Sequence, residues 1–552
     1  MAVYGGAQAA PEQKGWLEYK WKVLICVIFG VFMIVLDSTV VNVALRTVQS
    51  AYNVSLSNAQ WIVSVYVLAL GIMTPMSGFL ADRFGIKRMY VAGLSIFVLG
   101  SFLCGLAPSF SNSIWVLVGA RALQGFGGGM AQPLAAAFIY STFPPKEQGL
   151  ALGFFGISLV VGPALGPILG GWLVDQSLWQ WIFFINVPIG ILGVTLASRW
   201  LRKRPVEGKT PADVLGLITS VIGFGAVLLA ASEVSQKGWS SSFVLTTFGI
   251  GAVALLLFSV IELFVAKAPL LNLRLFGRPT FAIASLIGWV SVIGLFGAEF
   301  LMPLYLQILR GRTALETGVT LLPLALTAAI TTPIAGRLYD KIGPRPLVVG
   351  GFGLLLLNTW QLSHLQATTP ISTILLLLAL RGVALGMTVQ TTFATALGAV
   401  PRDKIARGSS LINGTRFVVQ SIGVAALATV LTGGLSTTTL SYQNAASQQA
   451  SATQPVKVTS APKPVAFGIC ETPGVAAEQN LPPGVPAVAA TQVRPKIQQA
   501  CSEYVSGFEK TYRVTFYFAI LAMLIGFFLP GWPLKWAGRG AAAGEAPPMP
   551  AH

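Results

Sequence analysis

The three ionisable side chains that lie deepest in apolar stretches long enough to span a membrane are those of Asp37, Arg121 and Glu299. A charge at that depth costs on the order of 3 kcal/mol even on insertion scales, so a functional role is the first expectation. Loss of water around a carboxylate also favours its uptake of a proton. We therefore expect all three residues to take part in proton coupling, and for Glu299 the alternative role is the contact for cationic substrates. The alternative is that either carboxylate forms a permanent ion pair with Arg121 that only holds helices together.

The sequence argues against other chemistry. Histidine occurs only at positions 364 and 552, which disfavours histidine-rich metal clusters and histidine-based catalytic triads. The stretch Gly208-Lys209-Thr210 resembles the end of a phosphate-binding loop, but Lys203 stands where that loop needs a glycine. We therefore expect no enzyme activity, no ATP hydrolysis, no metal site and no bound cofactor.

The elements that carry the three charged residues are expected to be membrane helices. Of the 552 residues, 54% are hydrophobic and 10% are charged, and the mean hydropathy is +0.72, which is more apolar surface than a water-soluble core can hide. The net charge of +17 does not indicate a nucleic-acid partner, because the basic residues lie between apolar runs. About fourteen segments reach spanning length: 23–44, 58–80, 89–107, 114–139, 150–173, 181–201, 212–232, 243–266, 279–309, 317–338, 346–365, 372–398, 408–434 and 513–531.

The charges of the connecting segments predict the orientation. With both termini in the cytoplasm, about 23 Lys and Arg lie in inner segments and about four lie in short outer loops. The expected parts are a cytoplasmic segment 1–22, an N-terminal six-helix bundle 23–201, two inserted helices with linkers 202–278, a C-terminal six-helix bundle 279–531 and a cytoplasmic tail 532–552. The C-terminal bundle includes a hydrophilic external loop, 435–511.

Two cysteines in the external loop form a candidate disulfide. Cys470 and Cys501 lie outside the apolar spans, on the side assigned as oxidising, and a bridge between them would close a loop of about thirty residues. We expect this bridge to order the loop as a lid or as a docking element for an unidentified partner. The alternative is a pair of free thiols in a disordered segment.

One stretch of the sequence occurs twice, at 74–87 and 332–345, with Thr, Pro, Gly, Leu, Asp and Gly in register. Such a duplication is typical of the parallel halves of secondary transporters. A carboxylate at a helix end can pair with basic residues or cap a neighbouring helix N-terminus, and both roles are conformational. The residues concerned are Gly78, Asp82, Arg83, Gly85, Lys87 and Arg88 in the first copy, and Gly336, Asp340, Gly343 and Arg345 in the second.

A further motif places small residues on one helix face. Gly162, Gly166 and Gly170 recur every four residues, a spacing that brings them into line and lets another backbone approach closely. This face is either a rigid packing seam or a seam that opens and closes as two halves rock. The full motif comprises Gly162, Pro163, Gly166, Pro167, Gly170 and Gly171.

Together these motifs resemble the major facilitator superfamily, specifically its fourteen-span drug:proton antiporter branch (EmrB/QacA type), over nearly the whole chain. Leu36-Asp37-Ser38-Thr39-Val40-Val41-Asn42 resembles the first-span signature of that branch. Arg121-Ala-Leu-Gln124-Gly125 resembles the basic motif of the fourth span, and Trp181 to Gly190 resembles the sixth span. Two departures are Arg46, where the family usually has Pro, and Gly149, where it often has Arg.

The resemblance implies an all-α integral membrane protein with two six-helix bundles and two inserted helices. It also implies that the repeated motif is a latch for an outward-open state, and that the motif at 162–171 belongs to antiport. We expect a multi-pass transporter of the bacterial cytoplasmic membrane that exports an amphipathic or drug-like compound in exchange for protons, with the proton gradient as its energy source. Export of a lipid, a siderophore or another metabolite is the alternative, and proton-coupled import is a less favoured one.

The substrate is expected near mid-membrane, between the two halves. Aromatic and amide side chains are the candidates for the lining of that cavity, because they can contact an amphipathic compound. They serve equally well as ordinary packing between helices. The candidates are Trp61, Tyr66, Tyr305, Gln307, Asn413 and Phe417.

Overall fold

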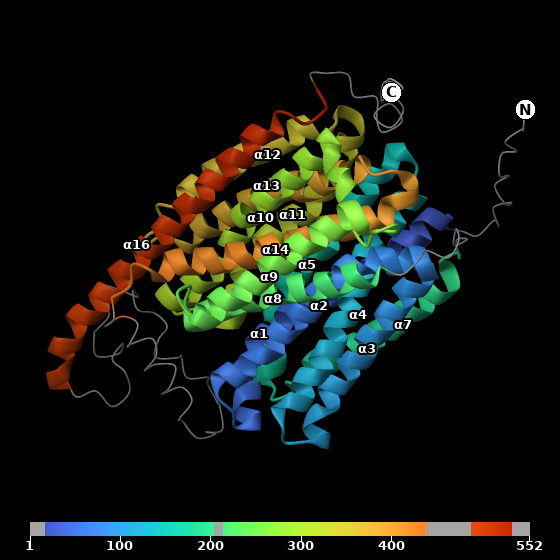
Figure 1. Cartoon of the computed structure of the whole chain (residues 1–552). Helices are drawn as coiled ribbons and strands as arrows, with labels where there is room; N and C mark the ends of the chain where they lie inside the picture. The colour runs from blue at the N-terminus through green and yellow to red at the C-terminus, as the bar shows by residue number, and fades with distance from the viewer. Residues whose placement is uncertain (1–16, 204–212, 437–438, 440–486, 533–552) are drawn as a thin grey trace, which may run out of the picture.

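The computed structural model of the protein describes residues 17–203, 213–436, 439 and 487–532. Within these ranges the chain forms long helices that run alongside one another, and no strand (Figure 1). Ten of the described helices are long and apolar enough to cross a membrane. The remaining predicted spans coincide with α4, α10, α12 and α16. The all-helical membrane fold is thus confirmed, and the count of about fourteen crossings is confirmed in part.

In chain order, the helices form two halves, and a pair of helices is inserted between them in the sequence. We call α1 to α7 the N-terminal half, α8 and α9 the inserted hairpin, and α10 to α16 the C-terminal half. The N-terminal half consists of α1 Tyr19–Tyr52, α2 Leu56–Phe84, α3 Ile86–Phe110, α4 Ile114–Thr142, α5 Gln148–Asp175, α6 Trp181–Phe184 and α7 Asn186–Trp200. The hairpin and the C-terminal half consist of α8 Val214–Lys237, α9 Ser242–Val260, α10 Pro279–Leu304, α11 Ala314–Ile342, α12 Pro344–Leu362, α13 Ile371–Gly398, α14 Ile405–Thr432 and α16 Ala487–Gly526.

The two halves meet along two pairs of helices, α5 with α11 and α2 with α14. Helices α5 and α11 are antiparallel, since Gly149 lies against Gly336 at one end and Gly171 lies against Leu315 at the other. We call the end of the bundle that holds Asp82 and Asp340 the latch end.

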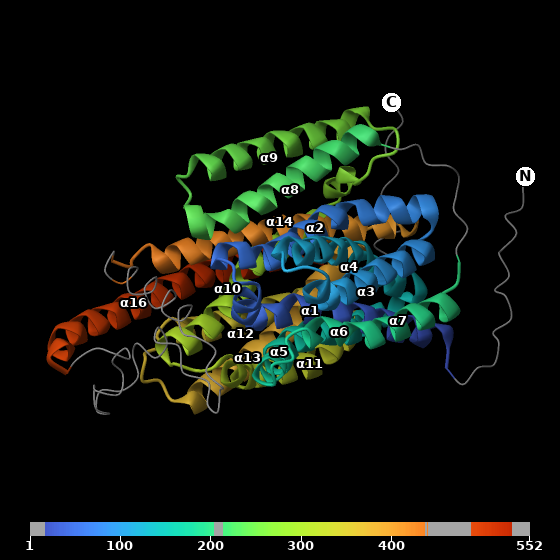
Figure 2. The same ribbon diagram turned by 90° about the horizontal axis from the view of Figure 1, so that it is seen from below.

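The inserted hairpin lies at the edge of the bundle, where α8 packs against both α2 and α14 (Figure 2). Away from the latch end it contacts both halves through side chains. Gln236 Nε2 donates to Gln60 Oε1 of α2 at 2.6 Å, and Trp239 Nε1 donates to Thr429 Oγ1 of α14 at 2.7 Å. The hairpin therefore bridges the two halves on one side of the molecule.

Two of the predicted segments differ from the helices of the structure. The span predicted at 181–201 is divided into α6 and α7, because Pro188 in the first turn of α7 has no N–H to donate to the preceding turn. This division sets Asn186 at the first position of α7, where it turns toward the interior. Helix α16 begins at Ala487, inside the predicted external loop 435–511, because its first part is rich in strong helix formers such as Ala, Gln and Lys.

Candidate functional site

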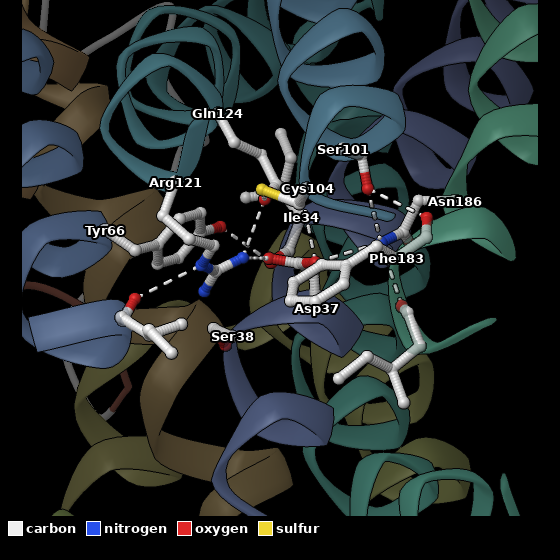
Figure 3. A network of polar contacts seen from close by, with 12 residues as sticks. Ile34, Asp37, Ser38, Tyr66, Ser101, Cys104, Arg121, Gln124, Phe183 and Asn186 are labelled. Carbon is white, nitrogen blue, oxygen red and sulfur yellow. Dashed lines mark hydrogen bonds and ion pairs between the residues drawn. The ribbon is translucent and has the colours of Figure 1, made fainter. Parts of the chain in front are cut away.

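The site is centred on the carboxylate of Asp37, which lies in the middle of α1 and is completely buried. Figure 3 shows this carboxylate between Arg121 of α4 and Asn186 of α7. Arg121 Nη1 donates to Asp37 Oδ2 at 2.6 Å, and Asn186 Nδ2 donates to Asp37 Oδ1 at 2.9 Å. A third donor, Gln124 Nε2, reaches Oδ1 at 2.9 Å. The charge on α1 is thus bound by side chains of two other helices of the N-terminal half, α4 and α7.

A second layer of contacts holds the donors in place. The Arg121 guanidinium lies 4.1 Å from the centre of the Tyr66 ring, and its Nε donates to the carbonyl oxygen of Ile62 at 3.2 Å. Its Nη1 also donates to Gln124 Oε1 at 2.7 Å. On the other side, Asn186 Nδ2 donates to Ser101 Oγ at 3.2 Å. These contacts therefore fix the orientation of the side chains that donate to the Asp37 carboxylate.

Asn186 leaves one acceptor beside the carboxylate. Its Oδ1 is buried and has no hydrogen-bond partner among the described residues. A buried polar atom without a partner costs free energy.

This arrangement ties a buried charge to the contact between two helices. An ion pair without water around it is strongly destabilised when one partner is removed, by about 3–5 kcal/mol, because the other charge stays buried. If α1 and α4 separate, the Asp37 carboxylate loses its cation. The geometry also fits the alternative of a permanent structural ion pair.

The third predicted proton-coupling residue, Glu299, is a residue of α10, and its side chain lies outside the described part. Its role stays a prediction. The sequence reasoning missed another buried charge in the C-terminal half, Arg381 of α13. Arg381 Nη2 donates to the carbonyl oxygen of Gly294 in α10 at 3.1 Å. The repeated motif recurs with an offset of 258 positions (340 − 82), which carries position 121 to within two residues of 381, so aligning the halves would have found it.

The first copy of the repeated motif makes an ion pair between the halves. Asp82 near the end of α2 accepts from Arg407 Nε of α14 at 2.5 Å. The other end of the same guanidinium, Nη1, donates to the carbonyl oxygen of Pro269 at 2.9 Å. Pro269 lies in the segment that joins the inserted hairpin to α10. One side chain therefore connects the N-terminal half, the hairpin linker and the C-terminal half. The sequence reasoning named Asp82 and missed Arg407.

The second copy contacts the other half through the backbone. Asp340 Oδ1 accepts from the N–H of Gly149 at 2.9 Å, and its Oδ2 accepts from the N–H of Leu150 at 3.1 Å. These are N–H groups at the start of α5, which have no partner inside the helix. Of the two roles weighed for the motif carboxylates, pairing with a base is found at Asp82 and helix capping is found at Asp340.

The glycines of both copies permit these contacts. A Cβ atom at Gly78 would lie 2.7 Å from the carbonyl oxygen of Ala406, and one at Gly336 would overlap the carbonyl oxygen of Gly149. Gly85 and Gly343 have φ of +94° and +83°, a region that side chains rarely adopt, and each forms the turn to the next helix.

The basic residues of the motif bind within their own half. Lys87 Nζ donates to the carbonyl oxygen of Ser198 near the end of α7 at 2.6 Å, and Arg345 Nε donates to that of Leu529 beyond α16 at 2.6 Å. A cation at a helix C-terminus is favourable for the helix dipole. Arg83 lies over the ring of Phe84, and the structure assigns Arg88 no role. Each copy thus ties its own half together with a base and reaches across with an acid.

The glycine motif of α5 faces α1. Cβ atoms at Gly162 and Gly170 would meet Leu36 and Val40 of α1, in the same half. The contact of α5 with the other half includes glycines nearer the latch end, such as Gly149 and Gly153, and the motif residue Pro167, which a Cβ atom at Gly318 of α11 would meet at 3.1 Å. Gly171, beside Leu315, reaches α11 from the opposite end of the helix. Pro163 and Pro167 lie within the unbroken helix.

The predicted cavity residues are spread over the molecule. Tyr66 belongs to the Asp37 network, and its hydroxyl donates to the carbonyl oxygen of Ile34 at 3.1 Å. Tyr305 donates to the carbonyl oxygen of Gln366 at 2.6 Å, and Asn413 donates to that of Ser409 in its own helix at 2.9 Å. Trp61, Gln307 and Phe417 are half-buried. The structure does not bring these six together, and their role stays a prediction.

The external loop lies largely outside the described residues, and Cys470 is among the residues not described. Cys501 lies on α16 and is disulfide-bonded. Its pairing with Cys470 and the lid role stay predictions. Among the described residues, no group of three or more His, Cys, Asp or Glu side chains could hold a metal ion.

Comparison with known proteins agrees with this architecture. The chain is 30% identical over 420 residues to lincomycin resistance protein LmrB of Bacillus subtilis (strain 168), and the match covers 76% of this chain and 87% of the relative. It is 33% identical over 412 residues to a multidrug resistance protein B homolog of Mycobacterium tuberculosis (strain ATCC 25618 / H37Rv), over 74% of this chain and 75% of the relative.

A solved structure of a double Trp mutant of XylE has the same fold, with a TM-score of 0.58 and 14% identity over 95% of this chain and 98% of that one. The family model of the Major Facilitator Superfamily matches residues 27–424. The chain therefore belongs to the Major Facilitator Superfamily and is a transporter, not an enzyme.

Proposed function

We propose that this transporter is a proton-coupled antiporter that exports amphipathic or drug-like compounds across the bacterial cell membrane by alternating access. The observation that carries the proposal is the Asp37 carboxylate, buried completely and held by Arg121, Gln124 and Asn186. A carboxylate in this position offers a proton site whose affinity depends on the distance to one guanidinium.

The cycle begins from the closed latch. With Arg407 bound to Asp82 and Asp340 bound to the start of α5, the halves are held together at the latch end. The charge bias of the loops assigns this end, and both termini, to the cytoplasm. Proton binding at Asp37 would free Arg121 and loosen α4 from α1. The latch would then open toward the cytoplasm, where the proton leaves and substrate enters.

The substrate class follows from the relatives. Proteins named for resistance to lincomycin and to multiple drugs support the export of drug-like compounds by this chain. A lipid, a siderophore or another metabolite remains the alternative cargo. Neither cargo needs a cofactor, because the proton gradient supplies the free energy.

The proposal is tested in inverted membrane vesicles with an imposed pH gradient, supplied from the outside with a panel of labelled amphipathic compounds. We expect gradient-driven uptake by the parent protein and at least a tenfold loss in Asp37→Asn, because an amide cannot exchange a proton. Glu233→Gln is the matched control, since Glu233 is also a buried acid but pairs with Lys237 on the inserted hairpin at 2.9 Å. Normal gradient-driven transport by Asp37→Asn would overturn the coupling role.

Arg121 provides the second arm of the test. Arg121→Lys keeps the charge and loses the planar fork, so we expect transport with a displaced pH optimum. Arg121→Ala leaves the Asp37 carboxylate without its cation and should abolish coupling. A pH profile of Arg121→Ala that matched that of the parent would contradict the mechanism.

A further inference from the structure

The inserted hairpin holds a buried acid that the proposed transport cycle does not use, Glu262 at the end of the hairpin's second helix. It is 2% exposed, and its two oxygens accept from the backbone N–H groups of Leu270 and Leu271 at 3.1 Å and 3.2 Å. Among the described residues, no lysine or arginine forms an ion pair with it. A buried charge without a cation beside it is costly, so the groups around Glu262 decide whether it can stay ionised.

A second carboxyl group, that of Asp213, faces Glu262 from the start of α8. Asp213 Oδ1 accepts from the N–H of Gly216 at 2.8 Å and so caps the helix. Its Oδ2 is buried, and no hydrogen-bond donor of the described residues reaches it. A Cβ atom at Gly216 would lie 2.2 Å from Asp213 Oδ2 and 2.8 Å from Glu262 Oε1, so the two oxygens border the same small space. The absence of a side chain at Gly216 therefore lets the two acids come together.

The basic side chains of this region do not neutralise the two acids. Arg274 donates to a backbone carbonyl of the hairpin, Arg407 binds the first copy of the repeated motif and the linker, and Lys267 is exposed. Asp213 is therefore the charged side chain that acts on Glu262 most directly.

The face of α8 that carries Gly216 contains another unsatisfied polar group. Gly223 on this face lies against α9, as Gly216 lies against Glu262, and Ser220 stands between the two glycines at helical spacing. Ser220 is completely buried, and its Oγ has no hydrogen-bond partner among the described residues. With both acids ionised, the polar atoms of this seam between α8 and α9 are therefore not satisfied by one another.

We infer that Asp213 and Glu262 share one proton, carried on Asp213 Oδ2 and donated to Glu262 Oε1. Two carboxylates side by side without a cation repel each other. One proton between them removes the repulsion and gives Asp213 Oδ2 a partner, so the proton belongs to the pair as a whole. The pair then carries a single negative charge, which the N–H groups of Leu270 and Leu271 stabilise. Loss of the proton to solvent leaves two charges in contact and drives the two helix ends apart.

The shared proton controls the linker that reaches the latch. Glu262 holds this linker at Leu270 and Leu271, and the same linker presents the Pro269 carbonyl to Arg407. The pair has bound its proton at low pH and loses it as the pH rises, so the linker is held under acidic conditions and released under alkaline ones. This inference concerns the latch and depends neither on the cargo nor on proton coupling elsewhere in the molecule.

The test follows amide hydrogen exchange at Leu270 and Leu271 in the purified full-length protein, corrected for the intrinsic effect of pH. Between about pH 6 and about pH 9, we expect the parent to lose about threefold to tenfold of its protection, because hydrogen bonds to the linker are lost. Asp213→Asn is the decisive variant. Its amide keeps an oxygen for the N–H of Gly216 and turns a permanent donor toward Glu262, so protection should stay high across the whole range.

Two further variants complete the comparison. Glu262→Gln keeps one acceptor oxygen, so it should exchange faster than Asp213→Asn and equally fast at both ends of the pH range. Glu233→Gln changes another buried acid of the same hairpin, one that pairs with Lys237, and should respond to pH as the parent does.

Infrared spectroscopy gives a readout that does not depend on exchange. The absorption of protonated carboxyl groups that the parent loses on raising the pH should be smaller in Asp213→Asn. Constant protection in the parent, or the same pH response in Asp213→Asn and the parent, would overturn the shared proton. Recovery of protection at high pH on addition of Na⁺ or Ca²⁺ would show that a metal cation joins the acids instead, and would overturn it as well. If Asp213→Asn does not fold, the pH response and the infrared spectrum of the parent decide.

Discussion

The two copies of the repeated motif connect the two halves of the molecule in different ways. Asp82 reaches across the halves to a side chain, the guanidinium of Arg407, whereas Asp340 reaches across to backbone N–H groups at the start of α5. A side-chain partner can be exchanged for another charge. A backbone partner cannot, and it requires the two helices to touch.

The contact at Asp340 therefore depends on glycine. Gly149 and Gly336 lie so close that a side chain at either position would meet the backbone of the other. An Arg at position 149, as is frequent in the related family, would not fit this arrangement. At the other copy, Gly78 approaches α14 closely as well, but there the ion pair adds an attraction that reaches further than contact. The first copy depends on charge and the second on shape, and this difference can be tested by variants that alter one property at a time.

The largest effect is expected from Gly336→Leu. The new side chain would collide with the backbone at Gly149 and force α5 and α11 apart, at a cost of about 1–3 kcal/mol or more to the closed latch. A change of 1.4 kcal/mol is tenfold in the ratio of closed to open molecules. Electron-spin distance measurements between labels at Lys146 and Lys341 should show a longer distance in most molecules. Gly249→Leu is the control, since Gly249 has no neighbour within 4 Å of its Cβ position. This variant should leave the distance between the labels unchanged.

The next effect concerns the ion pair. Asp82→Asn and Arg407→Gln should each open the latch, and the double variant should be less harmful than the sum, with a coupling of about 1–3 kcal/mol. The exchanged pair Asp82→Arg, Arg407→Asp should recover part of the closed population. The same spin labels measure it. Strict additivity of the two single variants would show that the ion pair seen here does not hold the latch.

Much of this architecture could be predicted from the sequence, because lipid imposes it. Long apolar runs mark the helices, and the duplicated Gly and Asp positions mark the latch end. The sequence also identifies Asp37 and Arg121 by their depth. The partners were harder to find, since Arg407 lies outside any repeated stretch and the orientation of Asn186 results from the helix break before Pro188. Contacts between residues far apart in sequence, such as Asp340 with Gly149, require the packing of two helices that no local pattern specifies.

A smaller effect is expected at the second carboxylate. Asp340→Asn keeps an oxygen that can accept one N–H of α5 and loses the negative charge at the helix N-terminus, a loss of about 0.3–2 kcal/mol. No exchange of charges can rescue it, because its partner is backbone. Transport and the spin-label distance should change less than in Asp82→Asn. If the Asp340 variant were the more severely affected, the division into a charge-dependent and a shape-dependent copy would be wrong.

The smallest effect is expected where the inserted hairpin joins the latch. Glu262, at the end of the second inserted helix and only 2% exposed, accepts from the backbone N–H of Leu270 at 3.1 Å and from that of Leu271 at 3.2 Å. These bonds fix the linker that presents the Pro269 carbonyl to Arg407. Glu262 thus fixes the linker that binds Arg407, the residue with which the first copy pairs. Among the described contacts, no comparable bond supports the partner of the second copy.

Glu262→Gln keeps one acceptor oxygen and turns an amide donor toward the second N–H, so one of the two bonds is lost. We expect faster hydrogen exchange at Leu270 and Leu271, by up to about tenfold, because one hydrogen bond is lost and a net hydrogen bond contributes about 0.5–1.5 kcal/mol. The closed latch should weaken slightly, since Asp82 still holds Arg407. Glu233→Gln, on the same hairpin but paired with Lys237, should leave this exchange unchanged. If hydrogen exchange at Leu270 and Leu271 were equal in Glu262→Gln and the parent, Glu262 would not support the latch. The difference between the two copies would then rest on Asp82 and Asp340 alone.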